Sequence, residues 1–289
     1  MKRLRARVES RRFLASVATL TYLLVVVIAP ATSVRAFGDG NGSEGNPYII
    51  TTCEELQDMA DDLDAYYRLG GDIDCSDTSS WNSGKGFDPI GDNVTPFTGR
   101  LDGSSYSISD LTILRANDVP SDSAPNDVLA EGDEEYVGLF GYISNANVSD
   151  VHVRTSKIKG FAYVGGIAGY MNGGSITNSS VNASTANNSC DPGDCVWARY
   201  GYYGGGIVGH LEAGTISDVT TAGPVKGSGF HIGGLVGNMA GGSVLDASTA
   251  SWTDGGNAIG GAVGSMFGGS VARVSSSGRA YAALDESAG

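Results

Sequence analysis

The sequence predicts an all-β protein of stacked parallel repeats, a β-solenoid with about 27–28 residues per repeat. A Gly-rich phrase recurs five times in the second half of the chain, at residues 137–141, 164–169, 204–209, 232–237 and 259–264. Taking Gly138, Gly166, Gly206, Gly234 and Gly261 as equivalent gives steps of 28, 40, 28 and 27 residues. The long step contains an extra stretch near residues 187–199. A unit of one or two short strands cannot bury its own apolar face, so the copies must stack.

The segments after the phrases alternate small, β-branched and polar residues, which is typical of strands with one buried face. Stacking predicts an internal aliphatic column of Ile176, Ile216, Val244 and Val271. Two residues later come Asn178, Asp218, Asp246 and Arg273. Strand parity would place them on the same buried face as the aliphatic column. Either these four lie at a corner where the chain turns, or the register differs there by one residue.

The first 36 residues are predicted to be an export signal. Basic residues crowd positions 1–12, an apolar run covers 13–29, and Val34-Arg35-Ala36 places small residues around a cleavage site. Ser10-Arg11-Arg12-Phe13-Leu14 partly matches a twin-arginine signal. The alternative is an uncleaved anchor, which would be the only contact of the chain with a membrane.

Removing this segment makes the chain strongly acidic. Residues 1–36 hold seven of the 18 Lys and Arg residues and one of the 32 Asp and Glu residues, so the other 253 residues carry a net charge of −20. This balance disfavours nucleic acid and anionic membrane surfaces as partners. Three explanations of this excess of acidic residues remain open, namely a saline habitat, calcium binding and solubility.

The four cysteines of an exported chain predict disulfide bonds. Proximity in the sequence favours the pairs Cys53–Cys75 and Cys190–Cys195 among three connectivities. A zinc site is disfavoured because the cysteines are widely spread and no histidine lies near them.

The segment 47–115 is predicted to form an N-terminal cap and the first coils, after a flexible leader at 37–46. Residues 48–50, 66–69 and 72–75 read as strands. Thr52 and Glu55 form a capping box, and Leu56 and Met59 follow at helical spacing. One short helix would therefore cap the stack and shield its first coil from water.

A family resemblance rests on this stretch and on the Gly-rich phrases. The motifs are Asn46-Pro-Tyr-Ile-Ile-Thr, Tyr67-Arg-Leu-Gly-Gly-Asp-Ile-Asp, Phe87-Asp-Pro-Ile-Gly, Pro96-Phe-Thr-Gly-Arg-Leu-Asp-Gly and Tyr106-Ser-Ile-Ser-Asp-Leu-Thr-Ile. In this order they resemble the GLUG-motif repeat proteins of prokaryotic cell surfaces, over residues 46–280. The resemblance implies a right-handed parallel β-helix and an extracellular setting. It implies no single activity.

The rest of the predicted organisation is an acidic surface loop at 116–135 and the repeat solenoid at 136–289. The sequence stops soon after a repeat, with no second cap. This predicts either a fragment or an uncapped last coil.

Aromatic residues near the long step are the candidate binding residues: Trp197, Tyr200, Tyr202 and Tyr203. Exposed rings there would bind surface glycans or another cell-surface protein. The simpler interpretation is that they cover the coil where the inserted loop leaves it.

Three acidic clusters are candidates for calcium binding or acid–base chemistry. Asp72, Asp74 and Asp77 are the candidate calcium ligands, and no cofactor other than calcium is expected. Asp72 with Asp74, Asp191 with Asp194, and residues 133–135 form no complete catalytic pattern, so no catalytic residue is predicted. The histidines His152, His210 and His231 are expected to be exposed or corner side chains.

The predicted function is that of a non-catalytic extracellular repeat protein acting as an adhesin, spacer or envelope component. Two alternatives remain. One is an accessory repeat segment of a larger secreted enzyme, such as a peptidase. The other is a carbohydrate-active β-helix enzyme, which requires carboxylates and a basic residue in one groove.

Overall fold

In the computed structural model, nearly all pairing between strands is parallel, and each repeat adds its strands to three sheets. The structure describes residues 37–115, 135–183, 195–198, 202–228 and 230–282. The all-β class predicted from the sequence is therefore confirmed, together with parallel stacking. The predicted signal at 1–36, most of the acidic loop at 116–135, Tyr200 and Cys190 lie outside the described residues.

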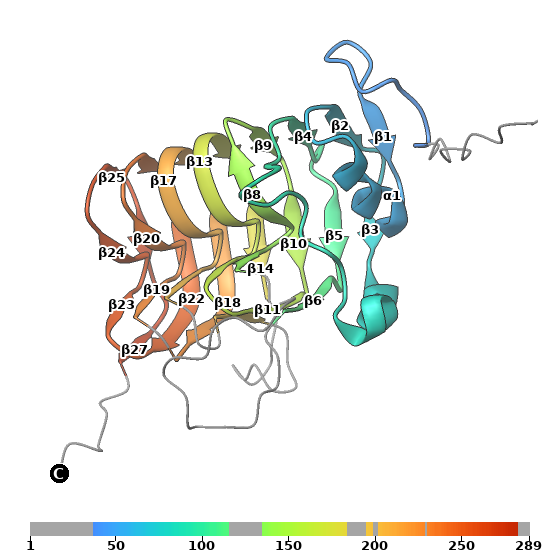
Figure 1. Ribbon diagram of the computed structural model, residues 1–289. Coiled ribbons are helices and arrows are strands. Elements are labelled where there is room, and N and C mark those ends of the chain that lie inside the picture. Colours follow the sequence, from blue (N-terminus) through green and yellow to red (C-terminus); the bar gives the residue numbers. More distant parts are fainter. Residues whose placement is uncertain (1–36, 116–134, 184–194, 199–201, 229, 283–289) are drawn as a thin grey trace, which may run out of the picture. The chain divides into compact units, whose positions relative to one another are not determined.

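The first sheet has eleven strands, which follow one another along the stack in Figure 1. They are β1 (Tyr48–Ile50), β2 (Tyr66–Leu69), β4 (Arg100–Asp102), β8 (Phe140–Ser144), β9 (Asn147–Ser149), β13 (Ala168–Thr177), β17 (Val208–Ser217), β20 (Val236–Met239), β21 (Ser243–Leu245), β24 (Val263–Met266) and β25 (Ser270–Ala272).

The second sheet also has eleven strands. They are β3 (Ile73–Asp74), β5 (Ser107–Ser109), β6 (Thr112–Leu114), β10 (His152–Arg154), β11 (Lys157–Gly160), β14 (Ser180–Asn182), β15 (Cys195–Ala198), β18 (Thr220–Gly227), β22 (Ser248–Gly255), β26 (Ser275–Ser276) and β27 (Ala280–Ala282).

The third sheet has five short strands that contain the start of each Gly-rich phrase. They are β7 (Tyr136–Val137), β12 (Tyr163–Gly165), β16 (Tyr203–Gly205), β19 (His231–Gly233) and β23 (Ala258–Gly260). Val137 pairs with Val164, so the first step is 27 residues in this sheet. The step grows to 28 at the next strand, where Phe140 pairs with Ala168, because the first phrase is one residue shorter than the others.

The predicted aliphatic column is confirmed. Ile176 pairs with Ile216, Ile216 with Val244, and Val244 with Val271. Leu101 and Val148 extend the column toward the N-terminal end. All except Val271 are fully buried, so each coil covers the apolar face of its neighbour.

The four polar residues that follow this column lie at a corner, which decides between the two alternatives left by the sequence. The φ angles of Asn178, Asp218, Asp246 and Arg273 are 46°, 55°, 49° and 54°. Asn and Asp tolerate this left-handed conformation better than most residues. Arg273 is held there by Asp246, whose carboxylate accepts hydrogen bonds from its Nε at 2.5 Å and Nη2 at 2.6 Å. These bonds lower the pKa of Asp246.

The N-terminal end carries the predicted helix. α1 (Cys53–Asp58) begins with the predicted capping box, in which Thr52 Oγ1 accepts from the Glu55 amide and Glu55 accepts from the Thr52 amide. Two short 3₁₀ helices, η1 (Met59–Asp61) and η2 (Ser76–Gly84), follow. Among the described residues, no helix is long and apolar enough to span a membrane.

The disulfide between Cys53 and Cys75 is present, with the Cα atoms 5.3 Å apart. It ties α1 to the end of β3. Cys195 is also disulfide-bonded, and its predicted partner Cys190 lies outside the described residues.

The leader at 37–46 differs from the predicted flexible segment. The Gly38 amide donates to Ile49 O at 3.2 Å, and the Ile49 amide donates to Asp39 O at 2.9 Å. The ring of Phe37 lies 4.4 Å from that of Tyr48. These contacts cover the free edge of β1, which explains why a Gly-rich and Asn-rich segment is held in place.

Candidate functional site

Two columns of aromatic rings run along the outside of the stack, where the third sheet meets the first. The first column, on β7, β12, β16 and β19, is Tyr136, Tyr163, Tyr203 and His231. The second, on β8, β13 and β17, is Tyr142, Tyr170 and His210. These seven residues are called the aromatic face.

Rings stack within each column. Neighbouring centroids are 5.0, 5.0 and 5.1 Å apart in the first column, and 4.6 and 4.5 Å apart in the second. Across the columns the contacts are edge-on, as between Tyr163 and Tyr170 at 5.6 Å. Since stacked rings cover each other's faces, the columns mainly join successive coils.

Ring surface that is open to solvent lies beside the columns instead. Tyr202, Phe230 and Phe267 are 52%, 46% and 77% exposed. Tyr202 stacks on Phe230 at 6.1 Å, and Phe267 lies 6.3 Å from His231. These three exposed residues are called the aromatic rim. Exposed rings beside a polar network can contact a sugar ring or an apolar side chain of a partner.

Glu212 anchors the polar network of the aromatic face. Its carboxylate accepts a hydrogen bond from the Tyr170 hydroxyl at 3.3 Å and lies 3.2 Å from His210 Nε2. On the other side of the ring, His210 Nδ1 lies 3.0 Å from Asn238 Nδ2. An amide nitrogen only donates, so Nδ1 accepts and the proton of neutral His210 is on Nε2, facing Glu212. Ser265 Oγ donates to Asn238 Oδ1 at 2.6 Å and extends the network to the last coil.

Burial determines how these groups titrate. It raises the pKa of Tyr136 to about 12, and the charge of Glu135 adds to this effect. The pKa of Tyr170 is raised by burial and then by Glu212. Burial lowers the pKa of His210, and the opposing effect of Glu212 is smaller. Tyr136 and Tyr170 are therefore neutral near neutral pH, and His210 is a neutral imidazole.

The buried histidine predicts a loss of stability on acidification. Because the pKa of His210 is lower in the folded state, the unfolded chain takes up a proton first as the pH falls through about 6.5. The free energy of unfolding should therefore decrease below that pH, and His210→Gln should weaken this dependence. Urea unfolding of both proteins at about pH 5 and about pH 7.5 measures this pH dependence. The contributions of the other titrating groups are the same in both proteins, so they cancel in the comparison. Identical pH dependence in both proteins would contradict a buried neutral His210.

The structure brings together only part of the predicted aromatic cluster. Tyr202 and Tyr203 are neighbours, with ring centroids 6.2 Å apart. Trp197 belongs to the second sheet, where Lys159 Nζ lies 4.3 Å from its ring centroid. Parallel pairing of β11 with β15 places this cation over the indole.

The expectation for the histidines is corrected for His210. It is only 8% exposed, and it lies next to the column that contains His231. His231 precedes its Gly-rich phrase and His210 follows one, so their sequence offsets differ. The turn within the phrase brings the two positions to neighbouring columns. His152 is half-buried, with Nδ1 2.9 Å from Ser180 Oγ.

The three predicted calcium ligands are not gathered into a site. Asp72 accepts from the amide and hydroxyl of Ser107, whereas Asp74 accepts from the Ser76 amide. These hydrogen bonds lower the pKa of both carboxyls. Within the described ranges, no group of three His, Cys, Asp or Glu residues is arranged to hold a metal ion, and Asp77 joins none.

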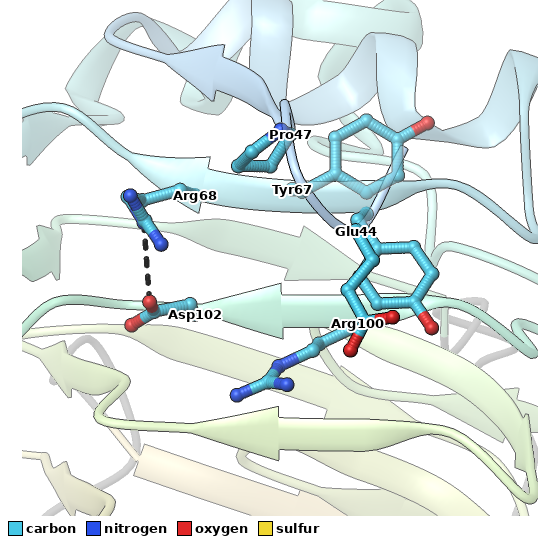
Figure 2. A pocket seen from close by; sticks show the side chains of 7 residues that line it. Glu44, Pro47, Tyr67, Arg68, Arg100 and Asp102 are labelled. Carbon is cyan, nitrogen blue, oxygen red and sulfur yellow. Dashed lines mark hydrogen bonds and ion pairs between the residues drawn. The ribbon is translucent and has the colours of Figure 1, made fainter. Parts of the chain in front are cut away.

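A cavity of about 220 Å³ lies at β2 and β4, near the N-terminal end (Figure 2). Its lining is Glu44, Pro47, Tyr66, Tyr67, Arg68, Arg100 and Asp102. Arg68 Nε donates to Asp102 Oδ2 at 3.2 Å, and the two residues are paired in register. The two arginines and two carboxylates cancel in formal charge. The cavity thus combines carboxylates with basic groups. No sequence motif marks it, because its residues come from three separate segments.

Comparison with known proteins gives partial matches. No family model matches the sequence. Halomucin of Haloquadratum walsbyi is 32% identical over 200 residues, which is 66% of this chain and 2% of halomucin. A protein described as a candidate Gly-rich membrane protein of Evansella cellulosilytica is 29% identical over 142 residues, which is 47% of this chain and 14% of that protein.

Among solved structures, a candidate immunoglobulin A1 protease from Bacteroides ovatus is similar with a TM-score of 0.49 and 19% identity. The match covers 88% of this chain and 84% of that one. The chain thus spans only a small part of the two curated relatives that it matches in sequence.

Proposed function

We propose that this chain is a right-handed parallel β-helix of the GLUG-motif type. Continuous parallel register supports the proposal: one residue of each coil pairs with its equivalent in the next, as Leu101, Val148, Ile176 and Ile216 do. The Gly-rich repeats contribute strands to all three sheets. This arrangement is expected when a chain winds around one apolar core.

The chain is proposed to be secreted or held at the cell surface. Two independent features support this location. The relatives that it matches in part are called halomucin and a Gly-rich membrane protein. The sequence of residues 1–36 has the composition of an export signal, and the described part contains a disulfide.

Its proposed role is that of a non-catalytic repeat protein, an adhesin or envelope component that contacts surface glycans or cell-surface proteins. The aromatic rim carries this proposal. Tyr202, Phe230 and Phe267 expose large rings on a rigid support of stacked coils, and rigid exposed rings lose little conformational entropy on binding.

Binding of residues 37–289 to a glycan array and to intact cells tests this role, with calcium and with a chelator. Replacement of Tyr202 and Phe230 together by alanine should reduce saturable binding at least about tenfold, because the stacked pair is lost. Val94→Ala is the matched control, since Val94 is 81% exposed on a turn outside the aromatic rim. Unchanged binding by the double variant would exclude the rim as the site.

The cavity in Figure 2 favours a second candidate, a carbohydrate-active enzyme on the same scaffold. It holds Glu44 and Asp102 beside Arg68 and Arg100, the combination that this alternative requires. Release of reducing ends from a bound glycan, abolished by Glu44→Gln, would support the enzyme. Binding without turnover would support the adhesin.

A further inference from the structure

The cavity at β2 and β4 contains a guanidinium group without a partner. Arg68 Nε donates to Asp102 Oδ2 at 3.2 Å, and Asp102 Oδ1 accepts from the amide and the hydroxyl of Ser104 at 2.8 and 3.3 Å. Both oxygens of Asp102 are therefore engaged. Within the described residues, the guanidinium of Arg100 makes no hydrogen bond or ion pair, and Figure 2 shows it apart from the Arg68–Asp102 pair. Arg100 is thus the cationic group of the cavity that a ligand can neutralise.

The register of the first sheet explains why Arg100 has no counter-ion. Arg100 pairs with Tyr66 on one side and with Asn147 on the other, and neither neighbour has a carboxylate. Arg68, in contrast, pairs with Asp102. Paired residues of a parallel sheet project from the same face on strands about 4.8 Å apart. The neighbouring coil therefore supplies a carboxylate to Arg68 and none to Arg100.

The walls of this cavity are held in place by the fold. β2 is paired on both sides, with β1 and with β4. Tyr67 is 1% exposed, and its hydroxyl donates to a backbone carbonyl oxygen at 2.7 Å. The Tyr66 amide donates to Gly42 O at 2.9 Å, which ties the turn that carries Glu44 to β2. A ligand meets groups that are already positioned, so little conformational entropy is lost on binding.

The charges that line the cavity favour a ligand with a single negative charge. A guanidinium presents two parallel N–H donors to a planar carboxylate, so Arg100 is suited to a carboxylate group. Glu44 and Asp102 also line the cavity and repel a group with two negative charges, such as a phosphate monoester. Within the described residues Glu44 accepts no hydrogen bond, so its oxygens can accept from hydroxyl groups. One carboxylate beside several hydroxyl groups is the chemistry of a sugar acid.

We propose that the cavity binds a uronic acid unit, with its carboxylate on Arg100 and its hydroxyl groups on Glu44. Pro47 and the ring of Tyr66 supply the apolar surface against which the sugar ring packs. The volume of about 220 Å³ is below the roughly 300–1,000 Å³ of sites for drug-sized molecules, so it suits one sugar unit of a larger glycan. This assignment rests on the proposed contact with surface glycans and requires no turnover.

NMR chemical-shift titration of residues 37–289 with glucuronate and with glucose tests the proposal. Glucuronate should bind at least about tenfold more tightly than glucose, because only the acid forms a charge-assisted pair with Arg100. Arg100→Gln should remove this preference. Arg154→Gln is the matched control, because Arg154 is an exposed residue of β10 in the second sheet, outside the cavity. Thermal unfolding of both variants verifies that they keep the fold.

Three results would overturn the proposal. They are equal or absent binding of glucuronate and glucose, a preference for glucuronate that Arg100→Gln leaves unchanged, and tighter binding of glucose-6-phosphate than of glucuronate. Binding of glucuronate without cleavage of a glucuronate-containing glycan would support the uronic acid site and exclude the carbohydrate-active enzyme. Because the aromatic rim lies outside the cavity, the variant of Tyr202 and Phe230 should bind glucuronate as the unmodified protein does. Failure of the rim and failure of the cavity are therefore distinguishable.

Discussion

Gly205→Ala is expected to destabilise the protein by about 3 kcal/mol. A Cβ atom on Gly205 would lie 2.0 Å from the carbonyl oxygen of Val208 and 2.8 Å from the amide nitrogen of Gly237. Both are backbone atoms, so no side-chain rotation relieves the clash. The equivalent glycines Gly165 and Gly233 meet the same close carbonyl three residues later. Urea unfolding followed by circular dichroism measures the loss.

Gly71→Ala is the matched control for this substitution. A Cβ atom on Gly71 has no neighbour within 4 Å. The change should alter the free energy of unfolding by no more than about 0.5 kcal/mol. Equal stabilities of the two variants would mean that the backbone between the third and first sheets moves apart at no cost in free energy. That result would contradict the close backbone contact at Gly205.

Ile216→Ala is expected to cost about 3 kcal/mol or more of unfolding free energy. Ile216 is fully buried in the middle of the aliphatic column, with Ile176 on one side and Val244 on the other. The cavity cannot be filled from either neighbour, because backbone hydrogen bonds fix the spacing between coils. Thermal and urea unfolding of the variant measure this cost.

Val271→Ala examines the same column at its last position. Since Val271 is already 38% exposed, the loss should stay below about 1 kcal/mol. A cost for Val271→Ala equal to that for Ile216→Ala would contradict the partial exposure of Val271.

The all-β class and the parallel stacking could be predicted because repetition determines the register. Once Ile176 and Ile216 are known to be equivalent, parallel pairing and strand parity place every neighbour in the repeat. The sequence alone does not decide whether Asn178 and Asp218 lie in a strand or at a corner. Strand parity places these residues on the buried face. Only the backbone shows the left-handed turn that moves them out of the strand.

The aromatic face was missed although its signal is present in the sequence. Tyr163 directly precedes a Gly-rich phrase, and Tyr170 directly follows the same phrase. Tyr136 and Tyr142 occupy the same two positions in the preceding repeat. The two positions lie seven residues apart in one repeat and six apart in the other. Whether the two rings touch depends on the angle through which the glycines turn the chain. This angle cannot be derived from the residue pattern.

By itself the sequence determined the repeat period, the all-β class, the buried column and the Cys53–Cys75 pair, because each follows from local spacing or from equivalence between repeats. The tertiary structure alone decided which positions meet across a corner, as Tyr170, His210 and Glu212 do. It also decided how far each equivalent residue is buried. Met239 and Met266 occupy the same position in the repeat, and only a neighbouring coil buries one and leaves the other exposed. Burial is a property of the neighbours that pack against a residue, whereas a repeat pattern describes only the residue itself.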